Sequence, residues 1–139
     1  MLDKKYKQGY KDLVVWRNAS QLRSAVYEIS KRFPGSEIRR VSQMNSAACS
    51  VKQNIQEGHR QTLGQYINAL KNICQPSLSE LQGDIEDCLE DKLITDDEFK
   101  KLDALCGKTD YLFSQLIKSL EIKRRKNNFN DGISKINIY

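Results

Sequence analysis

The chain has 139 residues, enough for one domain that buries a core without help from disulfide bonds. Hydrophobic residues make up 39% and charged residues 29% of it, and its formal net charge is +5, which is typical of a folded helical protein rather than a disordered one. No apolar run approaches the roughly 20 residues of a membrane-spanning helix. The basic N-terminus lacks the apolar segment of a secretory signal, so we expect a cytoplasmic protein that does not enter membranes.

Apolar residues recur every three or four positions in four successive segments, which is the spacing of amphipathic helices. No segment shows the alternation that predicts a strand. The four stripes cover residues 15–33, 41–55, 63–88 and 99–120.

Several residues predict where these helices begin. Ser36 follows a Pro-Gly break and can cap the second helix. Thr62 with Gln65, and Thr95 with Glu98, have the spacing of capping boxes for the third and fourth helices.

Two further residues predict where helices end or bend. Gly58 suits a left-handed residue after the second helix, and Pro76 is expected to kink the third because it removes a backbone donor. The connections are short, so successive helices should be antiparallel neighbours. We therefore predict an all-α fold, an antiparallel up-down-up-down four-helix bundle over residues 1–126, followed by an irregular C-terminal tail over 127–139.

The sequence contains four cysteines, and none of them forms a CxxC pair or a zinc-ligand pattern with histidine. Each lies in or beside an apolar stripe, where cysteine behaves as a small hydrophobic residue. We predict buried free thiols and no metal site at these positions: Cys49, Cys74, Cys88 and Cys106.

Three stretches of sequence resemble the bacterial four-helix-bundle family of 23S rRNA intervening-sequence proteins. They are YKDLVVW at 10–16, the NIxEG pattern of Asn54, Ile55, Glu57 and Gly58, and SLSEL at 77–81. The resemblance covers roughly residues 10–122, and it departs from the family pattern at Lys52, at Pro76 and in the tail.

The resemblance implies a homopentamer and suggests nucleic-acid binding, without an established reaction. The family is also similar in fold to accessory proteins of diversity-generating retroelements, which are pentameric bundles that work with a reverse transcriptase and RNA. That second likeness is an analogy of fold only.

The residues themselves offer little support for catalysis. Asn54, Glu57 and His59 lie near the end of the second predicted helix, but no nucleophile, metal-ligand pair or phosphate-binding loop accompanies them. We interpret Asn54 and Glu57 as hydrogen-bonding partners of a neighbouring helix end or loop. We expect no enzymatic activity, no catalytic residue and no cofactor.

Charge is distributed unevenly along the chain. Residues 1–75 carry 13 Lys or Arg against 5 Asp or Glu, whereas residues 80–103 carry 3 against 10. Residues 104–139 return to a positive balance of 7 against 3. In an up-down-up-down bundle the start of the first helix, the 58–62 connection and the end of the last helix share one pole, so this pole should be basic.

This basic pole is the predicted nucleic-acid-binding site, with Tyr6 and Tyr10 available to stack on bases. Its predicted ligands are RNA or another polyanion, bound mainly through phosphates. The alternative function is a protein-interaction scaffold, for example an accessory subunit of a reverse transcriptase or another ribonucleoprotein. The site residues are Lys4, Lys5, Lys7, Lys11, His59, Arg60, Lys123, Arg124, Arg125 and Lys126.

Apolar residues outside the central stripes exceed what one bundle core needs, which indicates a protomer interface. The examples are Val14, Ile73, Leu112 and Ile117.

Overall fold

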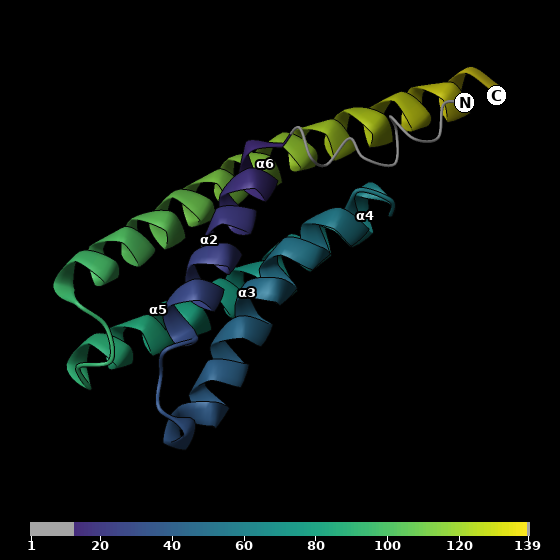
Figure 1. Ribbon diagram of the computed structural model, residues 1–139. Coiled ribbons are helices and arrows are strands. Elements are labelled where there is room, and N and C mark those ends of the chain that lie inside the picture. The colour runs from purple at the N-terminus through teal and green to yellow at the C-terminus, as the bar shows by residue number, and fades with distance from the viewer. Residues whose placement is uncertain (1–12, 139) are drawn as a thin grey trace, which may run out of the picture.

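A computed structural model describes the backbone of residues 13–138 and the side chains of residues 13–129 (Figure 1). The described chain is helical apart from short connections and contains no strand, so the all-α prediction is confirmed. The elements in order are α2 (Val14–Ser30), the 3₁₀ turn η2 (Gly35–Glu37), α3 (Ile38–Gly58), α4 (Leu63–Ala69), the π-helical segment η3 (Leu70–Cys74), α5 (Gln75–Glu90) and α6 (Asp96–Ile138).

Because α4, η3 and α5 follow one another without a loop, the chain forms four helical segments, as the apolar stripes predict. Helix α2 packs against α3 and α6, and α5 packs against the same two helices. Each segment contributes fully buried side chains to one shared core, for example Leu22, Val51, Leu81 and Phe113. None of the described helices has the length and hydrophobicity that crossing a membrane requires.

The third segment passes Pro76 by way of a π-helical stretch. The N–H of Gln75 donates to the carbonyl of Leu70, five residues back, and Pro76 then occupies the first turn of α5. A proline ring collides with the carbonyl four residues before it and offers no N–H to that carbonyl. In the turn just before Pro76, the backbone hydrogen bond spans five residues instead of four. The helix accommodates the proline through this π-helical turn.

The prediction of an irregular C-terminal tail is wrong, because α6 continues as a helix to Ile138. With 43 residues this helix is about 65 Å long. All described side chains from Ile122 to Phe129 are exposed, and Figure 1 shows this end projecting past the other helices. No described helix covers the end of this segment, so it needs no core-facing apolar stripe, and its Lys and Arg residues still favour a helix.

Both predicted capping boxes are confirmed. The backbone N–H of Gln65 donates to Thr62 Oγ1, and that of Glu98 donates to Thr95 Oγ1, at 3.2 and 3.1 Å. In return the side chains of Gln65 and Glu98 accept the backbone N–H of the two threonines. The prediction for Ser36 is wrong, because this residue lies inside η2 and α3 begins without a side-chain cap.

The prediction for Gly58 is also wrong. It is the last residue of α3, and none of the glycines in the described chain has a positive φ. The left-handed residue is Lys92, with φ of 59°, at the end of α5. The N–H groups of Lys92 and Leu93 donate to the carbonyls of Leu89 and Cys88, which closes the helix in a Schellman motif.

Candidate nucleic-acid interface

His59 and Arg60 lie in the tight corner between α3 and α4. The backbone N–H of Arg60 donates to the carbonyl of Glu57 at 3.0 Å, and the capping box at Thr62 starts the next helix two residues later. The His59 ring meets the Tyr66 ring edge-on, with centroids 6.4 Å apart. His59 is half-buried and Arg60 is exposed, so the corner presents the Arg60 cation at the surface.

Tyr66 forms the packed base of this corner. Its side chain is buried, and its hydroxyl has no hydrogen-bond partner within the described chain. Burial raises the pKa of Tyr66 to about 12, so the phenol stays neutral and the side chain serves to pack the corner.

Arg124 approaches the same corner from α6. A β-carbon built on Gly64, in the first turn of α4, would lie 3.3 Å from the guanidinium carbon of Arg124. One helical turn earlier, Lys71 of η3 donates to Glu121 of α6, and this hydrogen bond lowers the pKa of the Glu121 carboxyl. The pair attaches α6 to the third segment, so Arg124 of the last helix meets the corner that carries Arg60.

The other three cations of the predicted cluster do not face this corner. Successive residues of an α-helix point about 100° apart, so four consecutive cations spread around the whole helix. Lys123, Arg125 and Lys126 are exposed on the projecting part of α6 and point away from the side that Arg124 occupies. The structure therefore shows a rod of positive charge beside the corner, where the sequence predicted a single face.

Four residues of the predicted site, Lys4, Lys5, Lys7 and Lys11, lie outside the described residues. The same holds for Tyr6 and Tyr10.

At the opposite end of the molecule, two arginines are neutralised by carboxylates. Arg32 donates through both terminal nitrogens to Glu98 in the first turn of α6. Arg40 pairs with Glu37 at 3.0 Å and with Asp91 at 2.8 Å. The hydrogen bonds from Arg32 lower the pKa of Glu98 to about 2, and the hydrogen bond to Asp91 raises the pKa of Arg40.

The basic end differs in this respect. Within residues 13–129, no carboxylate forms an ion pair with Arg60 or with any of the four cations at 123–126. Arg125 is near enough to Glu121 to contribute to lowering the pKa of that carboxyl. The two ends thus differ: Arg32 and Arg40 are paired at one, whereas Arg60 and the cations at 123–126 form no ion pair with the described residues at the other.

Asn54 does not play the role expected of it. Its amide nitrogen donates to the carbonyl and to the hydroxyl of Ser50, at 2.8 and 3.2 Å, so it bonds within its own helix and not to a neighbouring one. Glu57 is exposed. No group of three or more His, Cys, Asp or Glu side chains in the described part of the chain could hold a metal ion.

Three of the four cysteines are buried, as predicted, and all four are free thiols. Burial raises the pKa of Cys74 and of Cys106 to about 12, and it also raises that of Cys88. The prediction of burial is wrong for Cys49, which is only half-buried and lies in a surface hollow between α2 and α3.

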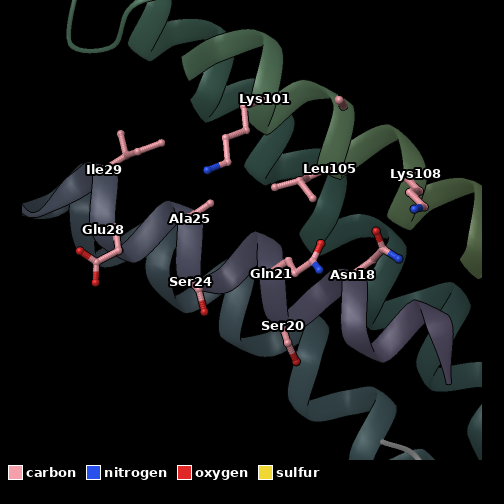
Figure 2. Close-up of a pocket in the computed structure, with 11 residues that line it drawn as sticks. Asn18, Ser20, Gln21, Ser24, Ala25, Glu28, Ile29, Lys101, Leu105 and Lys108 are labelled. Carbon is pink, nitrogen blue, oxygen red and sulfur yellow. The ribbon is translucent and has the colours of Figure 1, made fainter. Parts of the chain in front are cut away.

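Two grooves were not visible in the sequence. One, of about 770 Å³, runs between α2 and α6 (Figure 2). Apolar side chains such as Ile29 and Leu105 line it together with Gln21, Lys101 and Lys108. The other lies between α2 and α3. Such grooves depend on which polar faces the packing brings side by side, and the apolar periodicity does not specify this.

The apolar residues expected at a protomer interface divide into two kinds. Val14 and Ile73 are exposed by 51% and 41%, as an interface requires. Ile117 is buried in the core and Leu112 packs against it, so these two belong to the fold of a single chain.

Comparison with known protein families gives one result. The model of the family described as 23S rRNA-intervening sequence protein matches residues 11–115. None of the curated proteins matches the chain.

Proposed function

The chain belongs to the family of 23S rRNA-intervening sequence proteins, and from this premise we propose that it is a cytoplasmic, non-enzymatic RNA-binding protein. It binds phosphates at its basic end, which consists of Arg60, the four cations at 123–126 and the half-buried His59. The observation that carries the proposal is the contrast between the two ends of the molecule. Arg32 and Arg40 are neutralised by carboxylates, whereas Arg60 and the cations at 123–126 are exposed and form no ion pair with a carboxylate of residues 13–129.

Unpaired surface cations suit the chemistry of phosphate binding. A cation that already holds a carboxylate must give up that partner before it can bind a phosphate, whereas an unpaired one releases only counterions from the nucleic acid. Contacts of this kind position the protein on RNA and carry little base information. The proposed binding is therefore strong at low salt and weakly selective for sequence.

The shape of the basic end favours an extended polyanion. The corner carries Arg60, and the guanidinium of Arg124 lies against Gly64 in the first turn of the helix that follows. The rest of α6 continues away from this point with cations on its other sides. An RNA backbone can follow such a rod over several phosphates, which a small anion cannot do.

The first experiment replaces Lys123, Arg124, Arg125 and Lys126 by Gln and measures the affinity for a labelled RNA. Glutamine keeps the helix propensity nearly constant, so the change removes charge alone. The matched control removes four exposed cations from the same helix: Lys100, Lys101, Lys108 and Lys118. The proposal requires a much larger loss in the first variant. Equal losses would show that only net charge matters, and unchanged binding in the first variant would overturn the proposal.

A second experiment distinguishes binding at the corner near Arg60 from binding along the projecting part of α6. Arg124 faces α4, whereas Lys126 points about 200° around the helix from it. If the corner at Arg60 organises the RNA, Arg124→Gln weakens binding more than Lys126→Gln. A larger effect of the second change would place the RNA on the far side of α6.

We also propose that the four helices form an up-down-up-down bundle and that bundles associate into a homo-oligomer. The number five comes from the family resemblance. Tyr111, Ile122 and Phe129 lie on one side of α6, at intervals of 11 and 7 residues, and are exposed by 63%, 50% and 67%. An apolar stripe of this length on a solvent-facing helix favours a partner helix.

Self-association is measured by light scattering at micromolar concentration. Ile122→Asn and Phe129→Ser should shift the distribution toward smaller species while leaving the helical content unchanged. A wild-type protein that is monomeric under these conditions would contradict the proposal of a homo-oligomer.

A second candidate function is a protein-interaction scaffold, for example an accessory subunit of a reverse transcriptase. The groove between α2 and α6 favours it, because the side chains of Ala25, Ile29 and Leu105 are gathered there beside polar ones (Figure 2). Retention of a partner protein after nuclease treatment supports the scaffold, provided that Ala104→Arg in the groove abolishes it. Loss of the partner with nuclease supports RNA binding.

A further inference from the structure

The groove between α2 and α3 consists of two adjoining hollows of about 470 and 250 Å³. Arg23 and Cys49 line both hollows, so they form one continuous groove. On the α3 side its lining extends from Val41 to Gln56, which corresponds to about 22 Å along the helix.

The lining of this groove is cationic. Arg23, Lys31 and Lys52 line it, and no carboxylate is among the described residues that do. One acidic residue, Glu28, pairs with Lys31 at 3.1 Å between two well-exposed side chains. Exposed pairs of this kind contribute little, so Lys31 remains able to bind another anion.

Aromatic rings accompany two of these cations. The Lys31 ammonium lies 4.5 Å from the centre of the Tyr27 ring, and the Lys52 ammonium lies 5.3 Å from that of Trp16. Trp16 Nε1 also donates to Gln56 Oε1 at 3.0 Å, which fixes the indole beside the end of the groove. Tyr27 is 49% exposed, so part of its ring is accessible to a base.

The groove leads to the basic end of the molecule. Gln56 lines its last part, and Arg60 follows four residues later in the corner just past the end of α3. A strand whose phosphates contact the corner at Arg60 can therefore continue along α3 into the groove.

We propose that this groove binds a single strand of RNA, about six nucleotides long at 3.4 Å per stacked nucleotide. The proposal rests on the proposed function and adds the form of the ligand and its path. Arg23 and Lys52 bind phosphates, Tyr27 stacks on a base, and side-chain amides such as Gln53 meet base edges. A duplex keeps its bases paired and stacked inside, so rings and amides in a groove recognise a single strand better.

The test compares two variants that each lose two charges. Arg23→Gln with Lys52→Gln alters the α2–α3 groove, and Lys101→Gln with Lys108→Gln alters the α2–α6 groove. The probes are a labelled 12-nucleotide oligouridylate and an RNA duplex of 12 base pairs. We expect the first variant to lose on the order of tenfold in affinity for the single strand, with little change in the second variant. Equal losses in both variants, or a greater loss for the duplex, would overturn the proposal.

Tyr27 provides a test that does not change the charge. Tyr27→Ala should weaken binding of the oligouridylate several-fold, whereas Tyr27→Phe keeps the ring and should bind as the wild type does. Equal affinity of the alanine and phenylalanine variants would show that the ring does not stack on a base.

Cys49 reports occupancy of the groove directly. The other three thiols are buried, so alkylation by iodoacetamide in the folded protein measures access to Cys49. Saturating oligouridylate should slow this reaction several-fold. If RNA binds with undiminished affinity to the Arg23 and Lys52 variant and leaves Cys49 reactive, the groove proposal fails while the proposed function stands. If neither RNA probe binds the wild-type protein at low salt, the proposed function fails as well.

Discussion

The ring of Tyr66 occupies the space that a side chain on Gly58 would need. A β-carbon built on Gly58 would lie 2.6 Å from Cε1 of Tyr66 and 3.1 Å from its Cγ. The distance to Cε1 is shorter than the contacts that β-carbons make in proteins, so a side chain at this position would force Tyr66 to move. Gly58 is thus required by close packing between α3 and α4, and this packing fixes the corner that presents Arg60.

Gly58→Ala should destabilise the protein by about 1–3 kcal/mol, because an added methyl group in a packed site forces neighbouring groups apart. Its matched control is Gly83→Ala. Gly83 lies inside α5 and has no atom within 4 Å of an added β-carbon. The control should stabilise the protein by up to about 1 kcal/mol, since alanine favours a helix. Denaturant unfolding measures both, and equal changes in the two variants would contradict the packing explanation.

Lys92→Gly should stabilise the protein by about 1 kcal/mol. Lys92 has φ of 59°, a region that costs a residue with a β-carbon roughly that much and costs glycine nothing. The control, Lys100→Gly in the exposed interior of α6, should destabilise by a similar amount. Thermal unfolding of the two variants should therefore shift in opposite directions, and a lower midpoint for the first would contradict the assigned conformation.

The pair of Arg32 and Glu98 predicts a specific dependence of stability on pH. The pKa of Glu98 is lowered to about 2 in the folded protein, against an ordinary value of 4.5. The carboxylate therefore stabilises the fold above about pH 4.5, and this contribution is lost as the pH falls toward about 2. Glu98→Gln should cost about 1 kcal/mol at pH 7, a modest value because Arg32 is half exposed to solvent.

The difference between wild type and Glu98→Gln should vanish near pH 2, where the wild-type carboxyl gains its proton. Glutamine can still accept the N–H of Thr95 in the capping box, so the change isolates the charge. Asp97→Asn, in the same helical turn, is the control. A constant difference across pH 2–7 would show that the charge of Glu98 does not stabilise the fold.

Thiol accessibility should distinguish Cys49 from the other three cysteines. Buried thiols with a raised pKa form little thiolate and admit no reagent, as at Cys74 and Cys106. Folded protein at neutral pH should react rapidly at one thiol per chain, and Cys49→Ser should abolish this fast phase. Four thiols reacting at one rate would contradict the buried positions.

The sequence predicts the helices well because their signals are local. The apolar stripe and the Thr62 and Thr95 caps depend on neighbours within a few residues, and the structure reproduces them. Gly58 was misinterpreted because the reason for its presence is Tyr66, a residue on the next helix. The left-handed conformation of Lys92 could not be predicted, because the sequence signal for such a position is glycine and this residue is lysine.

The end of the chain was misinterpreted for a different physical reason. A helix in solvent needs no apolar stripe, so the absence of a stripe after Lys126 did not exclude a helix. The sequence predicts that the end of the last helix lies at the same pole as the 58–62 connection, and in the structure Arg124 lies against Gly64 just after that connection. The α2–α3 groove followed from no local signal, because Arg23 and Lys52 become neighbours only through helix packing.

RNA binding by the basic end is tested by the salt dependence of RNA affinity, compared between the wild type and the variant with glutamine at residues 123–126. Each phosphate contact contributes about 0.7 to 0.9 to the slope of log affinity against log salt concentration, depending on whether the RNA is single- or double-stranded. If the four cations neutralise phosphates, the variant shows a shallower slope by about 0.7 to 0.9 per lost contact, with helical content and oligomer size unchanged. A variant with the wild-type slope would contradict the assignment of the basic end as the RNA-binding surface.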